Sequence, residues 1–193
     1  LPFYRGRNIL NWALINDEKE FRITIHYIDE GIDTGDIILQ KCFPITDEDD
    51  YGTILNKAYL ECANLLSEVV GKFIISNVTS YPQSSIHPVG FYCHGRKDGD
   101  EYLNWNQTSR EIFNFVRAIS NPGPSAQCFL NKKIIHINKV KYLRNSPNYV
   151  GVPGTILSID QEGFEVKTQD SFIKVVDWKS EEKLKVGERF NES

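Results

Sequence analysis

Residues 21–43 read FRITIHYIDEGIDTGDIILQKCF, and this stretch decides the fold of the first part of the chain. Residues 21–28 alternate in the way typical of a β-strand, and residues 37–43 form a second apolar run that Pro44 closes. Residues 29–36, between them, hold two glycines and four acidic residues, a composition typical of a loop. We therefore expect a strand, an acidic loop and a second strand.

Two helices accompany these strands. The apolar residues of segment 8–15 suit a short helix, and segment 51–75 suits one long helix that begins after the polar capping sequence 46–49. The buried stripe expected of the long helix consists of Ile54, Leu55, Ala58, Leu65, Val69 and Phe73.

The first part looks incomplete as a folded unit. Two strands and two helices cannot cover both faces of a parallel sheet, and so small a domain is marginal in stability. The missing strands would come from upstream sequence or from another chain. The chain also begins at Leu1 and contains no methionine, so we expect it to be a piece of a longer protein.

The second part begins after a linker rich in proline and serine, residues 76–89. A strongly amphipathic helix is predicted over residues 109–119, capped by Thr108 or Ser109 and stopped by the proline-rich turn at 121–124. Five short strands should follow, a pattern typical of a small barrel. Their expected ranges are 127–130, 133–143, 154–159, 163–168 and 172–178. The predicted domains are therefore 1–79 and 80–193.

Composition excludes several classes of protein. The chain has 193 residues, a formal charge of −4 and 25% charged residues, which argues against a surface built mainly for nucleic acid. No apolar run is long enough to span a membrane, so no membrane partner is expected. The four cysteines lack metal-ligand or disulfide-framework spacing, so we expect reduced thiols, a cytoplasmic location and no metal site.

The acidic loop is the best candidate for a ligand site. Loops at the carboxyl ends of strands bind ligands in α/β proteins, and Gly31 and Gly35 would allow positive φ and a close approach. Asp33 lies between these glycines, where an aspartate can hydrogen-bond a histidine and adjust proton transfer. Calcium binding or a plain solvated turn remain alternatives on the residues alone.

A family resemblance narrows these alternatives. The series LPFYRGR at 1–7, NWA at 11–13, TIH at 24–26 and DEGIDTGD at 29–36 resembles the signature region of the folate-dependent formyltransferases. Residues 99–126 are more loosely similar to the second domain of that family, as are the strands around Gly154 and Gly163. The resemblance implies an α/β fold: the C-terminal portion of a Rossmann-like catalytic domain, followed by an OB-like β-barrel domain with a leading helix.

The resemblance also implies a reaction, the transfer of a formyl group from N10-formyltetrahydrofolate to an amine. The catalytic aspartate of the family falls at Asp33. The loop formed by Asp29, Glu30, Gly31, Ile32 and Asp33 is expected to hold the pterin end of the folate. The family's other catalytic residues, an Asn and a His, would precede Leu1. We therefore expect the 193-residue chain alone to be inactive.

Other polar residues near this loop have weaker assignments. Tyr4, Arg5 and Arg7 would flank the active-site entrance, where arginines could bind the phosphates of the acceptor. Arg5 could instead pair with acids such as Asp29 or Glu30. His26 matches a family position, but a structural role at the base of the loop, with a hydrogen bond to backbone, is the preferred interpretation.

Three functions compete. Basic and acidic residues are nearly balanced in the second part, which favours a small acceptor, a nucleotide-linked amino sugar, over tRNA. Methionyl-tRNA formylation is the alternative enzyme activity. A non-catalytic folate- or nucleotide-binding remnant is the third, and an Asn-x-His before Leu1 would argue against it. A homodimer is compatible with the sequence.

Overall fold

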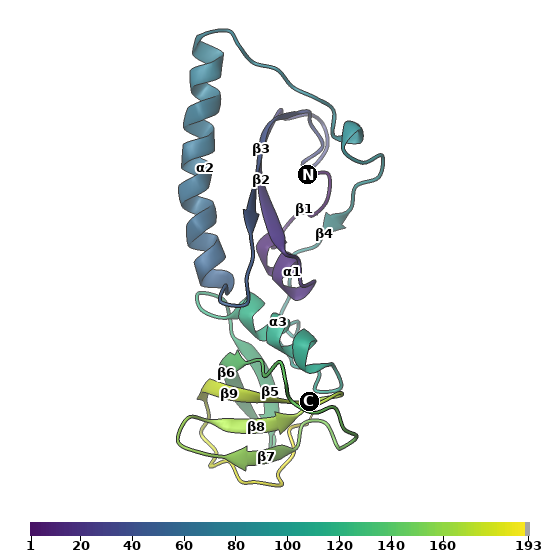
Figure 1. Ribbon diagram of the computed structural model, residues 1–193, viewed down its shortest axis with the longest axis vertical. Coiled ribbons are helices and arrows are strands. Elements are labelled where there is room, and N and C mark those ends of the chain that lie inside the picture. Colours follow the sequence, from purple (N-terminus) through teal and green to yellow (C-terminus); the bar gives the residue numbers. More distant parts are fainter. Residues whose placement is uncertain (192–193) are drawn as a thin grey trace. The chain divides into compact units, whose positions relative to one another are not determined.

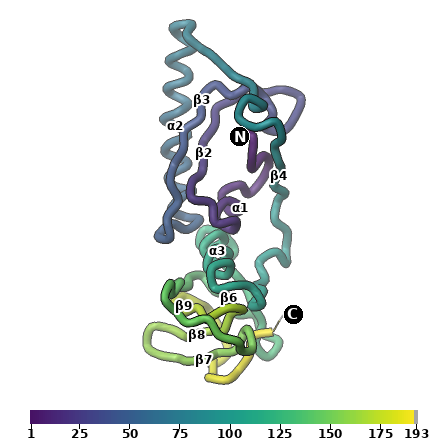
Figure 2. Tube along the Cα trace, turned by 45° about the vertical axis from the view of Figure 1, so that its right-hand side comes forward, coloured from purple at the N-terminus to yellow at the C-terminus, as the bar shows by residue number. Residues whose placement is uncertain are grey.

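The computed structural model describes residues 1–191 and divides into two compact units. The first combines residues 1–13 with residues 18–96, and the second combines residues 14–17 with those from Lys97 onward. Figure 1 follows the chain through both units by colour, and Figure 2 shows each unit from another side. Residues 80–96, which the sequence assigns to the second domain, belong to the first compact unit.

The first unit is built on a hairpin of two strands, β2 (Glu20–His26) and β3 (Ile37–Pro44). The strands pair antiparallel, with Phe21 opposite Phe43. The sequence predicts both strands and the loop between them, but not how the strands pair. The loop of residues 27–36 turns the chain straight back beside β2, so no crossover connection is needed.

The long helix α2 (Tyr51–Ile74) packs along this hairpin (Figures 1 and 2). Its N-cap is Asp50, whose carboxylate accepts from the Thr53 N–H while the Thr53 hydroxyl accepts from the Asp50 N–H. The predicted cap at 46–49 is therefore wrong, because Asp49 bonds back to Thr46 instead.

The buried stripe of α2 is narrower than the sequence predicts. Ile54, Leu65 and Val69 are buried, whereas Phe73 is 49% exposed. The helix presents only one line of residues to the two-stranded hairpin, so the flanks of the predicted stripe stay open to solvent.

Two short strands complete the first unit, β1 (Arg5–Gly6) and β4 (Tyr92–Cys93), which pair in parallel. The short helix α1 (Ile9–Ile15) follows β1, as predicted for 8–15. The expected linker is also bonded into the unit: Tyr81 and Ile37 exchange both backbone hydrogen bonds, and a 3-10 turn, η1 (Gln83–Ser85), follows. These bonds explain why the compact unit reaches Arg96.

The second unit contains α3 (Ser109–Ile119), with the bounds that the sequence predicts. Thr108 and Glu111 form a reciprocal capping box at its start. The helix packs on β5 (Ala126–Leu130), β6 (Lys133–Lys141) and β9 (Phe172–Lys179) through its buried apolar face.

Five antiparallel strands form the sheet of this unit, in the order β5-β6-β9-β8-β7, where β7 is Ile156–Ile159 and β8 is Phe164–Lys167. The chain near its C-terminal end bonds to both outer edges: Phe190 N donates to Gly154 O and Asn191 N donates to Phe129 O, both at 2.9 Å. Covering both edges in this way gives the closed arrangement expected of a small barrel.

Over residues 1–191, no helix combines the length and the apolar character that crossing a bilayer requires.

Candidate functional site

The acidic loop lies between β2 and β3, where the sequence places it. Its neck is closed by the Tyr27 N–H, which donates to Asp36 O at 2.9 Å. Gly35 is buried there, and a Cβ at this position would lie 1.8 Å from Tyr27 O. Gly35 therefore allows the two sides of the loop to meet, rather than a ligand to approach.

The backbone strain of the loop falls on Asp33. Asp33 has a φ of 57°, whereas Gly31 and Gly35 do not have positive φ. The expectation that these glycines supply the left-handed conformation is therefore wrong. Aspartate is among the few non-glycine residues that tolerate this region, because its short polar side chain can bond locally.

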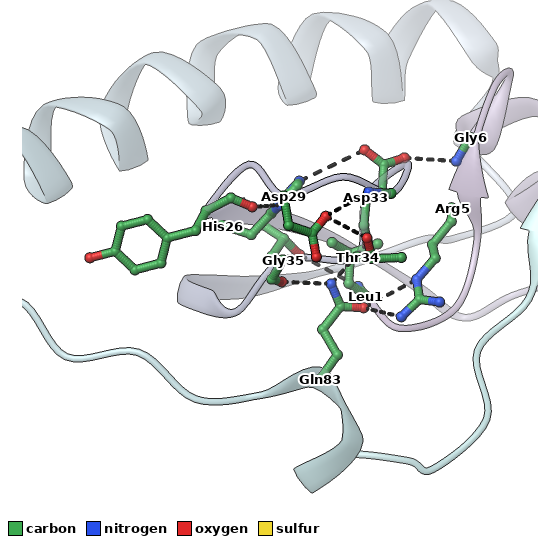
Figure 3. Close-up of polar contacts among 12 residues, drawn as sticks. Leu1, Arg5, Gly6, His26, Asp29, Asp33, Thr34, Gly35 and Gln83 are labelled. Atoms are coloured by element: carbon green, nitrogen blue, oxygen red, sulfur yellow. Dashed lines mark hydrogen bonds and ion pairs between the residues drawn. The ribbon is translucent and has the colours of Figure 1, made fainter.

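The Asp33 carboxylate is held from two directions (Figure 3). Its Oδ2 accepts from the Gly6 N–H at 2.8 Å, and its Oδ1 lies 3.7 Å from His26 Nε2. The side chain keeps 38% of its surface exposed. Asp33 is thus oriented by its neighbours and still open to a reactant.

His26 is the last residue of β2 and lies at the base of the loop. Its Nδ1 donates to Tyr27 O at 2.8 Å, which leaves Nε2 directed at Asp33. The predicted backbone hydrogen bond is therefore present. This hydrogen bond also fixes the orientation of the imidazole ring.

Asp29 stabilises the loop from within. Its Oδ1 accepts from the Thr34 hydroxyl and from the Gly31 N–H. The Thr34 hydrogen bond is the main reason that the pKa of Asp29 lies below its ordinary value. Asp29, Glu30 and Ile32 are exposed, so one face of the loop presents carboxylates beside an apolar side chain.

Arg5 contacts a glutamine and an aromatic ring, not the acids Asp29 and Glu30 that the sequence offered as alternative partners. Its Nε and Nη2 donate to the Gln83 side chain at 3.2 and 2.7 Å, and its guanidinium lies over the Tyr92 ring. The pairing with Asp29 or Glu30 is therefore not observed. Its assignment to acceptor phosphates stays a prediction.

Tyr4 and Arg7 precede and follow Arg5 in the sequence, and their side chains differ in hydrogen bonding and exposure. The Tyr4 hydroxyl donates to Glu18 Oε1 at 2.7 Å, and Tyr4 has a φ of 54°. Arg7 has an exposed side chain and a backbone N–H bonded to Cys93 O. Acceptor binding by both residues stays a prediction, and the exposed Arg7 can reach an acceptor more easily.

Gln83 is the residue of this site that sequence reasoning missed. It lies within the predicted linker, where a polar side chain is expected to face water, yet it is 4% exposed. Its amide contacts both Arg5 and the acidic loop (Figure 3). No local pattern marks it, because its partners are 48 or more residues away in sequence.

A cavity of about 510 Å³ opens beside Asp33 and His26. Apolar side chains from β2, α1 and α2 make up most of its remaining wall, among them Ile23, Leu10 and Leu55. A volume in this range suits a small organic ligand. Asp33 therefore faces a concave surface that could hold one.

No cluster of three or more metal-ligating His, Cys, Asp or Glu side chains occurs within residues 1–191.

Comparisons with known proteins match both parts of the chain. Residues 1–70 match the family model described as formyl transferase, and residues 96–191 match the one described as formyl transferase, C-terminal domain. This chain is 36% identical to the methionyl-tRNA formyltransferases of Thermodesulfovibrio yellowstonii and Pelotomaculum thermopropionicum, over 91% and 92% of its length. The chain spans about half the length of these relatives, 54% and 55%.

Solved structures agree with this assignment. WlaRD, a sugar 3N-formyl transferase studied with dTDP and 5-N-formyl-THF, has a TM-score of 0.70 and 26% identity, over 92% of this chain and 62% of its own. The N-formyltransferase of Helicobacter canadensis, in complex with folinic acid and dTDP-3-aminofucose, has the same TM-score and identity, over 93% and 63%. With one formyltransferase model matching each part and an aspartate-bearing loop beside a cavity, the chain belongs to the formyltransferase family.

Proposed function

We propose that the full-length protein transfers a formyl group from N10-formyltetrahydrofolate to the amine of a nucleotide-linked amino sugar. The observation that carries the proposal is the placement of Asp33. Its carboxylate lies on the wall of a cavity, is fixed by the Gly6 N–H, and has His26 beside it. A fixed and accessible carboxylate is what proton transfer at an attacking amine requires.

The chemistry of the transfer assigns work to these groups. Formyl-folate supplies the formyl carbon, which moves from one nitrogen to another. The attacking amine must lose a proton as its new C–N bond forms, and the departing nitrogen must gain one. Asp33 supplies a carboxylate that adjusts this proton transfer, and the Gly6 N–H keeps that carboxylate oriented.

The family resemblance adds two groups that would precede Leu1. An Asn would donate to the oxygen that becomes negatively charged, and a His would assist proton transfer at the amine. His26 lies beside Asp33, but the proposal does not give it the role of the His that would precede Leu1.

Folate binding is assigned to the exposed face of the loop. Asp29, Glu30 and Ile32 are exposed, and they share the loop with Asp33, the residue of this loop that lines the cavity. Carboxylate acceptors suit the amino and ring N–H donors of a pterin, and the isoleucine offers an apolar contact to its rings. This match of chemical groups supports a reduced folate as the formyl donor, in line with the folate compounds in the two solved sugar formyltransferases.

The charge of the second unit supports a small acceptor. This unit, residues 14–17 and 97–193, contains 14 Lys plus Arg and 14 Asp plus Glu, so its charges are balanced. Three lysines of its sheet are already paired with acids: Lys133 with Glu182, Lys141 with Glu162, and Lys174 with Asp160. A surface that binds tRNA needs lysines free to neutralise phosphates.

Methionyl-tRNA formylation is the second candidate. It is favoured by the 36% identity of two curated relatives with that name, a higher figure than the 26% of the sugar formyltransferases. A non-catalytic folate- or nucleotide-binding protein is the third. An Asn-x-His sequence before Leu1 would argue for an enzyme over this alternative.

One experiment separates the three. The full-length protein is incubated with N10-formyltetrahydrofolate and either a dTDP-linked amino sugar or charged initiator tRNA, and the acceptor is analysed by mass spectrometry. Formylation of the sugar alone is expected. Formylation of tRNA alone would replace the proposal with its alternative, and folate binding without transfer to either acceptor would support the binding protein.

A further inference from the structure

Gln83 is a buried glutamine in an otherwise exposed stretch. It is 4% exposed, whereas residues 84–89 are all exposed. A buried amide loses its hydrogen bonds to water, so it is stable there only when protein groups replace them. The partners of Gln83 therefore indicate why it is buried.

The side chain of Gln83 uses its full bonding capacity (Figure 3). Its Nε2 donates to Asp33 O and Gly35 O, both at 2.8 Å, and its Oε1 accepts from Nε and Nη2 of Arg5. An amide has two N–H donors and an oxygen with two lone pairs, and all four are engaged. Two carbonyls require donors and a guanidinium requires an acceptor, so the environment fixes which way the amide points.

These bonds converge on Asp33. Gln83 fixes the carbonyl group of Asp33, and Gly6 fixes the carboxylate of the same residue. Because Arg5 and Gly6 are neighbours in β1, one strand reaches Asp33 both directly and through Gln83. A positive φ at a non-glycine residue is strained and persists only where the surroundings hold it.

We propose that Gln83 is a positioning residue for formyl transfer, which keeps Asp33 in its left-handed conformation and its carboxylate on the cavity wall. This inference rests on the proposed function and deepens it. Gln83 need not touch either substrate, and its effect on the reaction passes through Asp33.

A double-mutant cycle in the full-length protein tests this. Gln83→Leu removes every polar contact at similar size, and Gln83→Glu keeps an acceptor for Arg5 but places an oxygen against two carbonyls. Each variant is measured alone and combined with Asp33→Asn. Gln161→Glu, at an exposed position of the second unit, is the matched control for the added charge.

Each Gln83 variant should lower kcat about 10- to 100-fold, as expected when a reacting group is displaced by about an ångström. The KM for the acceptor should change by less than about threefold, since no ground-state contact is removed. Combined with Asp33→Asn, the Gln83 changes should lower kcat by less than about twofold further, because the group on which they act is gone. Gln161→Glu should retain wild-type kcat.

The inference would be overturned if the Gln83 changes lowered kcat equally with Asp33 intact and with Asp33→Asn. Wild-type kcat in both Gln83 variants would also overturn it. An inactive wild-type protein would instead count against the proposed function. In that case amide hydrogen exchange at residues 33–36 decides the inference. Exchange at least about tenfold faster in Gln83→Glu, with circular dichroism unchanged, supports positioning, and unchanged exchange overturns it.

Discussion

The backbone N–H of Gly6 donates to Oδ2 of Asp33 at 2.8 Å and joins β1 to a loop 27 residues later in the sequence. The position of Gly6 is held by its parallel pairing with Cys93. The orientation of the candidate catalytic carboxylate thus depends on a strand of only two residues.

Gly6→Ala should therefore impair the site from a distance. Gly6 has a φ of 101°, and a Cβ there would lie 2.5 Å from Cys93 O. The substitution should destabilise the fold by about 1–3 kcal/mol and displace the N–H that orients Asp33. Urea unfolding of the chain and formyl-transfer kinetics of the full-length protein should both reveal the loss; unchanged values in both would contradict this role.

Gly35→Ala should be more damaging than an ordinary glycine substitution. The Cβ would lie 1.8 Å from Tyr27 O, which belongs to backbone and cannot move aside cheaply. We expect a loss of about 1–3 kcal/mol or more in the free energy of unfolding. Gly71→Ala in α2 is the matched control, because nothing lies within 4 Å of its Cβ.

Gly71→Ala should stabilise the fold by about 1 kcal/mol, since alanine is a better helix former than glycine. Denaturant unfolding of the two variants should move the midpoint in opposite directions. An unchanged or raised midpoint in Gly35→Ala would show that the neck of the loop is not closely packed.

Acid should weaken the bonds that Asp29 makes within the loop. The pKa of Asp29 is lowered below its ordinary value of 3.8, mainly by the Thr34 hydroxyl. A carboxyl with a lowered folded pKa contributes its stability above the unfolded pKa and loses it as the pH falls through the folded one. The loop should therefore stay ordered above about pH 4 and loosen below it.

Carboxyl-carbon NMR titration tests this assignment. Thr34→Val removes the hydroxyl at nearly constant size, so the Asp29 midpoint should be higher in this variant than in the wild-type chain. Identical midpoints in the two proteins would show that the Thr34 hydrogen bond does not stabilise the ionised carboxylate.

The regular elements were predictable from the sequence because their patterns are local. The alternation of β2, the apolar run of β3 and the amphipathic pattern of α3 can each be recognised within one short, continuous segment of sequence. The acidic loop was located for the same reason, since strands bound it on both sides.

The details that shape the site were not predictable, because they depend on distant partners. The left-handed residue is Asp33 and not a glycine, since Gly6 and Gln83 hold it from remote segments. Gln83 itself lies among prolines and serines that suggest a linker. Its burial becomes visible only when the Tyr81–Ile37 pairing brings this stretch against the hairpin.

The chain of residues 1–193 alone should show no formyl transfer. Asp33 would orient proton movement, but the Asn and His implied by the family resemblance would precede Leu1. Assaying this chain beside the full-length protein, with the same formyl-folate and acceptor, checks the expectation. Activity in the shorter chain would mean that His26 or another described residue supplies the missing chemistry.

The most direct measurement compares Asp33→Asn with the wild-type full-length protein in formyl transfer to a dTDP-linked amino sugar. Asparagine tolerates the left-handed conformation and can still accept the Gly6 N–H, so thermal unfolding should be nearly unchanged. We expect kcat to fall by about 10²- to 10⁴-fold, the usual contribution of a positioned acid–base group. Wild-type kcat in a folded Asp33→Asn protein would contradict the account.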